Sequence, residues 1–571
     1  MEIPEIESSQ LILDDARRLT GPSMLWSKTG AILDVLIEDM DMDVVLDCWH
    51  RQLRHLLLQL GWQDRAIMYR RFENGFNLLI EAPIDQLYSA VLVLETSWYF
   101  CCCELLAIDV EDEEALVHEI RSSIRSESNP ALLELQQSAA RHEVDFLVDD
   151  DEVSIGHGEG GICWPVDAIP ELDQIPWSEI HDIPVALITG TNGKSTSVRL
   201  LDGIAKAAAQ VSGVTSTDFV RVGNDVLDHG DYSGPGGARL LLRDKRLQVA
   251  FLEVARGGIL RRGLPLRRAR AALVTNIASD HLGQYGVNTL EALTEVKFAV
   301  RKILAEDGVL VVNADDQNCR AYMDKVEQDN TCWFSLDKEH ALIKQQIDAQ
   351  GRCCYSDAGS IVYFDGAEAK FICEIAQIPM TLDGAALHNV RNALGAVGVA
   401  AALGYTVEQI RQGLTRFHSD EHDNPGRLNT FALSNGARVI VDFAHNAHSV
   451  EAVVDTVKRM PAQNKWVVFG SAGDRSDDDI NAIAKGVCAI DPDHVVITEI
   501  EYYLRGREPG EVSEIIKRAC LDSGLALNQL HFAGSPLQGV QLAVAELQTG
   551  DLGLFLVLTE RDEVLRFIKQ S

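Results

Sequence analysis

From residue 169 onward, short apolar runs alternate with segments whose apolar residues recur at helical spacing. The apolar runs predict buried strands at 185–189, 249–254, 272–275 and 308–312. The segments between them include predicted helices at 195–210 and 290–304. Because this alternation is typical of a mostly parallel sheet covered by helices, we expect a P-loop-type α/β domain that binds ligands at the carboxyl ends of its strands.

The alternation restarts after residue 424 and predicts a second α/β unit, which we expect to be Rossmann-like. Its apolar runs predict strands at 439–443, 465–469, 494–498, 530–532 and 554–558. Its helical patterns lie at 450–458, 480–489, 512–520 and 536–547. About 150 residues is an ordinary domain size, so the segment is long enough to fold around its own core.

The first 168 residues predict an α+β domain, with a helical pattern at 44–60, an apolar β-branched run at 90–99 and candidate strands at 26–36 and 70–80. A glycine-rich stretch at 156–161, followed by three prolines, predicts a linker or an exposed turn. We therefore expect three domains in this chain of 571 residues, at 1–168, 169–423 and 424–571.

Composition narrows the classes of protein that fit. The 46% hydrophobic and 24% charged content is typical of a soluble globular protein, and no uninterrupted apolar run reaches the ~18 residues of a membrane span. A net charge of −35 argues against nucleic acid as a partner. The acidic N-terminus lacks a secretion signal, and the twelve scattered cysteines indicate reduced thiols, so we expect a cytoplasmic protein. Solubility is the simpler explanation of this negative charge, and attraction of a cationic substrate such as arginine is the alternative.

The most informative motif joins the 185–189 strand to the 195–210 helix and reads Gly190-Thr191-Asn192-Gly193-Lys194-Ser195-Thr196. Two glycines let the backbone curl so that its N–H groups face an anion. Lys194 adds a positive charge for the outer phosphates, and the Ser195 hydroxyl can ligate Mg²⁺. The motif predicts a nucleotide phosphate site, and a chance turn is the alternative.

Further polar residues follow the predicted strands of the central domain. Glu253 lies at the carboxyl end of the 249–254 strand, where its carboxylate can hold Mg²⁺ or pair with Arg256 or Arg261. His281 follows another strand and can ligate a divalent ion as neutral imidazole. Lys297 lies on a predicted helix, where a solvent-facing lysine is the simpler interpretation.

Two later segments contribute candidates for nucleotide recognition. The Asn389 and Asn392 amides suit an adenine edge, although a helix N-cap would also explain Asn389. Arg427 can reach a γ-phosphate from a hinge before the last domain, and Asp442 can accept from ribose hydroxyls. A surface ion pair is the alternative for any single arginine.

Over residues 180–571 the chain resembles the Mur ligase superfamily, and within it the ligase portion of the cyanophycin synthetases. Beside the glycine-lysine loop, the motifs that carry the resemblance are Thr215-Ser216-Thr217-Asp218, Ala255-Arg256-Gly257-Gly258-Ile259-Leu260-Arg261, Ala472-Gly473-Asp474-Arg475 and Leu504-Arg505-Gly506-Arg507. Those synthetases also carry an ATP-grasp module, for which we expect no room in this sequence.

The resemblance implies ATP and Mg²⁺ as cofactors. Lys194 would bind the β- and γ-phosphates, Ser195 and Glu253 would hold one Mg²⁺ and His281 a second, and Lys297 resembles a lysine that several Mur ligases carbamylate. Asn389, Asn392, Arg427 and Asp442 would contact the nucleotide. The substrates would meet Thr217, Asp218, His445, Asn446, Arg475 and Arg507.

The resemblance also implies an ATP-dependent carboxylate–amine ligase that acts through an acyl phosphate, for example adding arginine to an aspartyl-type carboxylate. The partners would be small-molecule or peptide substrates, and a homodimer is one assembly that the sequence allows. The family's His-Asn-Pro-x-Gly turn reads His445-Asn446-Ala447-His448-Ser449 here, which changes the backbone options of that loop. Two alternatives therefore stay open, a nucleotide-binding scaffold without ligase activity and a folylpolyglutamate synthetase-like ligase.

Overall fold

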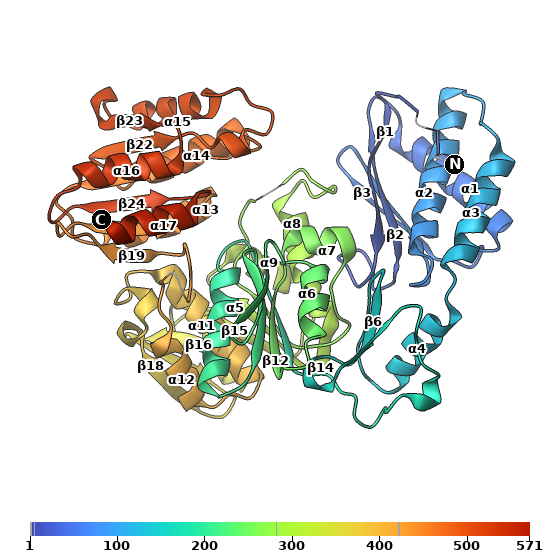
Figure 1. Cartoon of the computed structure of the whole chain (residues 1–571), viewed down its shortest axis with the longest axis horizontal. Helices are drawn as coiled ribbons and strands as arrows, with labels where there is room; N and C mark the ends of the chain where they lie inside the picture. The colour runs from blue at the N-terminus through green and yellow to red at the C-terminus, as the bar shows by residue number, and fades with distance from the viewer. Residues whose placement is uncertain (1–2, 5, 281, 421–422) are drawn as a thin grey trace. The chain divides into compact units, whose positions relative to one another are not determined.

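The computed structural model describes residues 3–4, 6–280, 282–420 and 423–571. The chain divides into two compact units, which are described separately below. The first comprises Met1–Val198, Ala208–Cys332 and Val399–Tyr405, and the second comprises Arg199–Ala207, Trp333–Gly398 and Thr406–Ser571. Figure 1 traces the chain through both. The division into domains at 168 and 423 stays a prediction.

The first unit begins with a four-stranded antiparallel sheet in the order β1-β2-β4-β3, where β1 is Leu11–Leu19, β2 Gly30–Ile37, β3 Ile67–Phe72 and β4 Gly75–Glu81. The helices α1 (Met42–Leu60), α2 (Leu87–Leu106) and α3 (Glu113–Glu127) pack on one face of it (Figure 1). The predicted helix at 44–60 is confirmed as α1. The single strand expected at 70–80 is instead a hairpin, because the chain turns between Phe72 and Gly75.

The apolar run at 90–99 forms part of α2 and not a strand. This helix is long and apolar enough to cross a membrane by length and composition, but 67% of its most apolar window is buried inside the protein. Its Ser97 hydroxyl accepts a hydrogen bond of 3.1 Å from Trp49 Nε1 of α1. A helix that is apolar on nearly all sides is expected where other elements surround it, as they do in this core.

The chain next forms the helix α4 (Pro130–Arg141) and a small three-stranded antiparallel sheet. The strands of this sheet are β5 (Phe146–Val148), β6 (Glu152–Ile155) and β7 (Ile162–Pro165). The expectation of a linker or exposed turn at 156–161 is wrong, because Gly156, His157, Gly158 and Gly160 are buried. The glycines permit close packing: a Cβ at Gly158 (φ +61°) would lie 2.6 Å from the Leu247 carbonyl oxygen.

The main sheet of the first unit has the strand order β11-β10-β9-β12-β8-β13-β14. The five strands β9 (Ser212–Thr215), β12 (Val249–Glu253), β8 (Val185–Thr189), β13 (Ala269–Val274) and β14 (Leu304–Asn313) run parallel. The hairpin β10 (Phe219–Val222) and β11 (Asp225–His229) extends one edge. The four strands predicted here are confirmed, and their carboxyl ends lead into the loops that carry the candidate site.

Helices connect these strands, namely α5 (Lys194–Ala207), α6 (Pro235–Leu242), α7 (Arg256–Arg262), α8 (Leu290–Phe298) and α9 (Gln317–Met323). The predicted helices at 195–210 and 290–304 correspond to α5 and α8, although α8 gives way to a 3₁₀ turn at Ala299–Ile303.

The second unit contains β15 (Thr331–Ser335), β16 (Cys353–Asp357), β17 (Ser360–Phe364) and β18 (Ala369–Glu374), which pair in that order through residues 333–374. Three helices accompany them, α10 (Ala341–Asp348), α11 (Leu387–Ala402) and α12 (Val407–Arg416). The sequence prediction assigned none of these strands.

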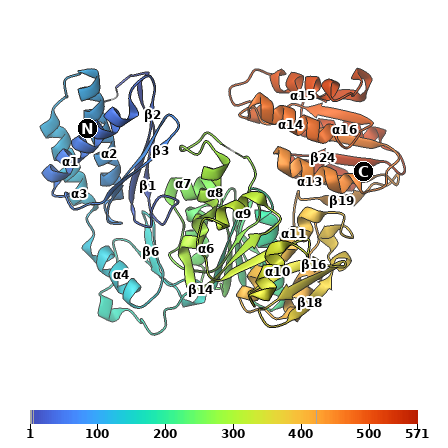
Figure 2. The same ribbon diagram turned by 180° about the vertical axis from the view of Figure 1, so that it is seen from behind.

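The C-terminal sheet has the order β19-β20-β24-β21-β22-β23 and is parallel except for β19. Its strands are β19 (Asn429–Ala432), β20 (Arg438–Asp442), β21 (Lys465–Phe469), β22 (His494–Thr498), β23 (Leu530–Ala533) and β24 (Leu552–Leu556). Helices pack on both faces of this sheet (Figure 1 and Figure 2). One face carries α13 (Ala447–Lys458), α14 (Asp477–Cys488) and α15 (Glu511–Asp522), and the other carries α16 (Pro536–Glu546) and α17 (Arg561–Gln570). The predicted Rossmann-like α/β arrangement is confirmed.

All twelve cysteines, each within the described part of the chain, are free, and eleven of them are buried. They act as small apolar residues in the cores.

Candidate functional site

The glycine-lysine loop connects β8 to α5 in a conformation that requires its glycines. Gly190 has φ +138° and Gly193 has φ +86°, both in the region that L side chains rarely adopt. A Cβ at Gly190 would lie 1.9 Å from Thr275 Oγ1, so the close packing of the loop against the end of β13 excludes any larger residue. The loop therefore has the tight turn between a buried strand and a helix that the motif predicts.

Two residues that follow β13 hold the loop in place. Asn276 accepts from the Asn192 backbone N–H at 3.0 Å through Oδ1 and donates to the Asn192 carbonyl oxygen at 2.9 Å through Nδ2. Thr275 Oγ1 donates to the same carbonyl oxygen at 2.7 Å. The Thr191 hydroxyl donates to the Ala278 carbonyl oxygen and accepts from the Ala278 N–H. These bonds preorganise the loop before any ligand binds.

Lys194 and Ser195 begin α5 directly after the loop. The Lys194 ammonium folds back and donates to the Thr191 carbonyl oxygen at 2.9 Å. Ser195 is buried, and its Oγ lies 3.4 Å from Thr217 Oγ1, which follows β9. The structure thus places Thr217, a predicted substrate residue, beside the predicted metal ligand Ser195. Thr196, the last residue of the predicted nucleotide motif, is also buried. The carbonyl oxygen of Asp218, a predicted substrate residue, accepts from the Gly230 N–H.

Glu253 ends β12 with only 2% of its surface exposed, and it is paired in register with Ile188 of β8, two residues before the loop. Its backbone N–H donates to Thr215 Oγ1 at 3.2 Å. Glu253 ends β12, and Ser195 lies in α5 directly after the loop that follows the neighbouring strand β8. Both offer oxygen donors, the type of ligand that fits Mg²⁺. His281, the predicted ligand of a second ion, lies outside the described residues.

Lys297 is buried in α8, so the solvent-facing interpretation from the sequence is wrong. Its Nζ donates to the Gly190 carbonyl oxygen at 2.8 Å, which brings it to the glycine-lysine loop. Burial disfavours the ammonium form and the charge of Lys194 adds to this effect, so together they lower the pKa of Lys297 to about 7. A lysine with this pKa is partly a neutral amine near neutral pH.

The second unit holds the predicted nucleotide residues of α11. Asn389 is buried and donates through Nδ2 to the Met380 carbonyl oxygen at 2.8 Å, and Asn392 donates to Asn389 Oδ1 at 3.2 Å. The N-cap alternative for Asn389 is wrong, because α11 begins earlier, at Leu387.

Arg427 and Asp442 lie together at the start of the C-terminal sheet. The Arg427 guanidinium carbon lies 4.6 Å from the centre of the Phe443 ring, and its Nη1 is buried with no hydrogen-bond partner among the described residues. Asp442 accepts the Leu428 and Ala444 backbone N–H groups, each at 2.7 Å. Burial raises the pKa of Asp442 to about 6, and the charge of Arg427 opposes that rise.

The altered His445–Ser449 turn is the N-terminus of α13. Asn446 is the N-cap, and its side chain accepts from the Ser449 N–H at 2.9 Å. The Ser449 hydroxyl in turn accepts from the His445 and Asn446 N–H groups, each at 3.1 Å. A reciprocal capping box therefore closes this turn without the proline and glycine of the family pattern.

Arg507 and Arg475, two predicted substrate residues, lie in one loop cluster of the second unit. Arg507 donates to the Gly473 carbonyl oxygen at 2.8 Å and to the Arg475 carbonyl oxygen at 2.9 Å, and it also pairs with Asp477 and Glu511. These contacts brace the loop that follows β21. The Arg507 guanidinium is thus engaged within the protein, and its role toward a substrate stays a prediction.

In the first unit the structure brings together Gly190, Lys194, Ser195, Thr217 and Lys297. The candidates of α11 and the C-terminal domain form separate groups in the second unit. Sequence reasoning missed Thr275 as an anchor of the loop, and it gave Arg256 no role of its own beyond a salt bridge to Glu253 and a place in the Ala255–Arg261 motif. The signal for Thr275 was its position directly after a buried strand, and the signal for Arg256 was its place in that motif.

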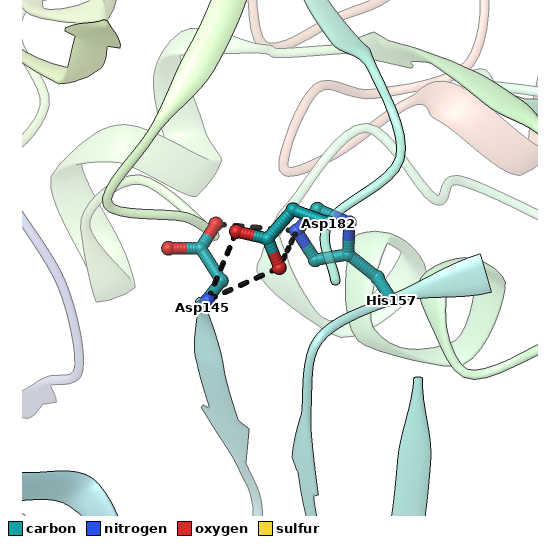
Figure 3. Close-up of side chains that lie close together, drawn as sticks. All are labelled: Asp145, His157 and Asp182. Carbon is teal, nitrogen blue, oxygen red and sulfur yellow. Dashed lines mark hydrogen bonds and ion pairs between the residues drawn. The ribbon is translucent and has the colours of Figure 1, made fainter. Parts of the chain in front are cut away.

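Outside this site, Figure 3 shows a cluster of Asp145, His157 and Asp182, of which Asp145 and His157 are buried and Asp182 is half-buried. His157 Nε2 lies 3.2 Å from Asp145 Oδ2 and 3.4 Å from Asp182 Oδ1, and the Asp145 N–H donates to both Asp182 oxygens. Burial opposes the imidazolium form, but the hydrogen bond to Asp145 and the two carboxylate charges raise the pKa of His157 overall. The cluster ties the β5–β6 hairpin to the segment that enters β8.

Comparison with known proteins identifies the family. The Mur ligase middle domain matches residues 188–400, and the Mur ligase glutamate ligase domain matches residues 426–556. The chain belongs to the Mur ligase family.

Among curated relatives, cyanophycin synthetase of Nostoc sp. is 37% identical over 336 residues, 59% of this chain and 37% of that protein. The same enzyme of Crocosphaera subtropica is 36% identical over 61% of this chain and 40% of its own length. UDP-N-acetylmuramyl-tripeptide synthetase of Deinococcus radiodurans is 26% identical over 65% of this chain and 72% of its own. The chain thus spans less than half the length of the cyanophycin synthetases that it matches.

Solved structures also resemble the chain. MurF from Acinetobacter baumannii has 17% identity and a TM-score of 0.49 over 68% of this chain and 77% of its own. Escherichia coli FolC in complex with DHPP and ADP has 20% identity and a TM-score of 0.49 over 68% of this chain and 89% of its own.

Proposed function

We propose that this protein is an ATP-dependent ligase that joins a carboxylate to an amine. The observation that carries the proposal is the preorganised loop of Gly190–Ser195, with Lys194 at its end and the buried Lys297 bonded to the Gly190 carbonyl oxygen. Such a loop suits the phosphates of a nucleotide, since backbone N–H groups and a lysine supply positive potential at a helix N-terminus. Membership of the Mur ligase family supports ATP as that nucleotide.

The reaction would proceed in two displacements. An oxygen of the acceptor carboxylate attacks the γ-phosphorus of ATP, the bond from that phosphorus to the β–γ bridging oxygen breaks, and ADP leaves. The amine nitrogen then attacks the acyl carbon of the acyl phosphate, phosphate leaves with the bonding electrons, and the amine proton is transferred to it. Lys194 would neutralise charge on the transferring group, and Arg427 is a second candidate for that role from the C-terminal domain.

Ser195 and Glu253 would hold the Mg²⁺ of the nucleotide, and the ion would supply charge neutralisation between the phosphates. Glu253 lies at 2% exposure on a strand, where a carboxylate needs a cation or hydrogen-bond donors to offset its desolvation. Lys297 would keep the loop carbonyl oxygens in place from its buried position. Lys297 would also be a candidate for the carbamylation found at the matching lysine of several Mur ligases. Its pKa of about 7 favours this modification, because carbamylation needs a neutral amine.

The substrates are part of the proposal. The cyanophycin synthetases among the relatives suggest arginine as the amine and an aspartyl-type carboxylate as the acceptor. The net charge of −35 is compatible with a cationic amine substrate. We further propose a cytoplasmic protein whose partners are these small molecules and not nucleic acid.

The test is phosphate release from MgATP across a panel of carboxylate and amine pairs, including aspartyl peptides with arginine and tetrahydrofolate with glutamate. We expect turnover that needs both substrates and that falls by about 10²–10³-fold in Lys194→Ala. Lys206→Ala is the matched control, since Lys206 lies near the other end of α5 and pairs with Asp202. Turnover with folate and glutamate alone would favour the folylpolyglutamate alternative.

The scaffold alternative makes a different prediction in the same assay. A scaffold would bind MgATP tightly and release no phosphate with any pair. The capping box at Asn446–Ser449 weakens the reason for this alternative, because the altered turn keeps a well-bonded helix start.

A further inference from the structure

Arg256 is a buried cation at the first residue of α7, three residues after Glu253. Only 9% of its surface is exposed. Its Nη2 donates to Gln284 Oε1 at 2.6 Å, whereas its Nη1 is buried without a hydrogen-bond partner in the described part of the chain. A guanidinium carries five donors in a fixed planar arrangement, so a buried donor without an acceptor is costly.

The charges around Arg256 belong to the candidate active site. Asp280, which precedes the predicted metal ligand His281, interacts electrostatically with both Arg256 and Lys297. Arg256 also acts on the charge of Lys297, which is bonded to the glycine-lysine loop. Three basic groups, Lys194, Lys297 and Arg256, are therefore electrostatically coupled around one loop. An anion bound beside them would stabilise their charged forms.

The segment that holds Arg256 is in turn held by the N-terminal sheet. Arg70 of β3 donates to the Gly286 carbonyl oxygen at 3.0 Å, and Asn77 of β4 donates to the Tyr285 carbonyl oxygen at 3.3 Å. These contacts fix the backbone on the C-terminal side of Gln284, the residue that accepts from Arg256.

A buried ion pair supports these contacts inside the sheet. Arg17 of β1 and Asn77 both donate to the Asp34 carboxylate of β2, at 2.5 and 2.7 Å. Arg17 also donates to the Leu260 carbonyl oxygen of α7 at 2.9 Å, and its guanidinium carbon lies 4.8 Å from the centre of the Tyr285 ring. The N-terminal sheet therefore contacts both α7, which carries Arg256, and the 284–286 loop.

We propose that Arg256 binds an oxyanion of the substrate, the acceptor carboxylate or the phosphate that forms on it, and that the N-terminal sheet positions Arg256 through the 284–286 loop. The proposal rests on the proposed ligase function and assigns to the first eighty residues a role in that site. Arg256 contacts the anion, whereas Asn77 and Arg70 are positioning residues. An arginine suits both anions, because its paired N–H groups match carboxylate and phosphate oxygens.

The experiment measures two kinds of binding on the whole protein, by calorimetry. The first is the Kd of MgADP alone. The second is the Kd of each of two anions added to the MgADP complex, orthophosphate in one arm and an aspartate-terminated peptide in the other. We expect Arg256→Gln to weaken one or both anions by roughly 10- to 100-fold while the Kd of MgADP changes less than about threefold. The matched control is Arg261→Gln, an exposed arginine of the same helix.

Asn77→Leu and the milder Arg70→Gln test the positioning role, and the second of these keeps a polar side chain at a half-buried site. Each variant should weaken binding of the anion by roughly three- to tenfold and leave the Kd of MgADP unchanged. Each should have no further effect when Arg256→Gln is already present, because both changes act through the same guanidinium. A merely structural role would instead weaken both ligands and would add to Arg256→Gln.

The outcomes separate this proposal from the ligase function. Wild-type protein that binds no MgADP would contradict the proposed function itself. Wild-type protein that binds MgADP but neither anion, or Arg256→Gln protein that binds both anions as tightly as wild type, would overturn the role of Arg256. Additive effects of Asn77→Leu and Arg70→Gln in the Arg256→Gln background would overturn the role of the N-terminal sheet. If Arg256→Gln weakens the binding of orthophosphate but not of the peptide, the site is assigned to the transferred phosphate.

Discussion

At the scale of single residues, Lys297 shows how burial sets chemistry. Its sequence position gives no sign of burial, because a lysine on a helix usually faces water. In the structure the ammonium is buried and bonded to the Gly190 carbonyl oxygen, beside a second lysine. The same residue therefore has a low pKa and a direct contact with the glycine-lysine loop.

Lys297 gives a prediction for stability against pH. Its pKa is about 7 in the folded protein, below the usual value near 10.5, so the unfolded chain binds more protons between these two values. The free energy of unfolding therefore rises with pH across that range. Lys297→Met should remove this dependence and stabilise the protein at pH 7 by about 1–3 kcal/mol, with a smaller gain at pH 10. Denaturant unfolding at both pH values measures the difference, and an equal effect at both would contradict the assignment.

At the scale of elements, the start of α13 explains how the chain departs from the family turn. The Asn446 N-cap is extended, with φ −130° and ψ 160°, and Ala447 is the first helical residue. That backbone also suits a residue before proline, and proline is favoured at the first helical position.

We therefore expect Ala447→Pro, which restores the family proline, to change the free energy of unfolding by less than about 0.5 kcal/mol. Ser449→Ala should cost about 1 kcal/mol, because it removes the hydroxyl that accepts two backbone N–H groups. The two variants share a helix turn and serve as controls for each other in thermal unfolding. A destabilisation by Ala447→Pro as large as that by Ser449→Ala would show that the loop differs from the described one.

The buried His157 cluster predicts a second pH effect with the opposite sign. The folded pKa of His157 is raised, so its contribution to stability is complete below the unfolded pKa near 6.5 and is lost as pH rises through the folded value. His157→Gln should lower stability by roughly 3 kcal/mol at pH 6 and by less at pH 8.5. Tryptophan fluorescence can follow the unfolding, since Trp164 and Trp177 pack in this core. His118→Gln, at an exposed site of α3, should change little, and an equal loss for His157→Gln at both pH values would argue against a charged imidazole.

The elements also show what the sequence could and could not predict. The strands around Leu187 and Val467 were predictable, because buried parallel strands are continuous apolar runs between helical patterns. The run around Val93 could not be assigned to a helix or a strand, since a helix buried on most sides has the same composition as a buried strand. The strands around Val362 were missed because their residues alternate weakly and are joined by short turns.

At the scale of the whole molecule, features set by residues close together in the chain were predictable from the sequence, whereas contacts between distant residues were not. The conformation of the glycine-lysine loop was predictable because Gly190, Gly193 and Lys194 act within one turn. Its anchor Asn276 and the link from Asn77 to Tyr285 join residues far apart in the chain, so only the fold brings them together. The glycine-rich stretch at 156–161 was misjudged for the same reason, since its packing partners lie in distant segments.

The central claim is that the loop of Gly190–Ser195 binds the phosphates of a nucleotide that drives ligation. The most direct measurement is the calorimetric Kd and stoichiometry of MgADP for wild-type protein, Lys194→Ala and Lys206→Ala. The account predicts one site per chain, a loss of affinity of roughly 10- to 100-fold in Lys194→Ala, and an unchanged Kd in Lys206→Ala. Equal affinity in all three proteins, or no binding to the wild type, would contradict it.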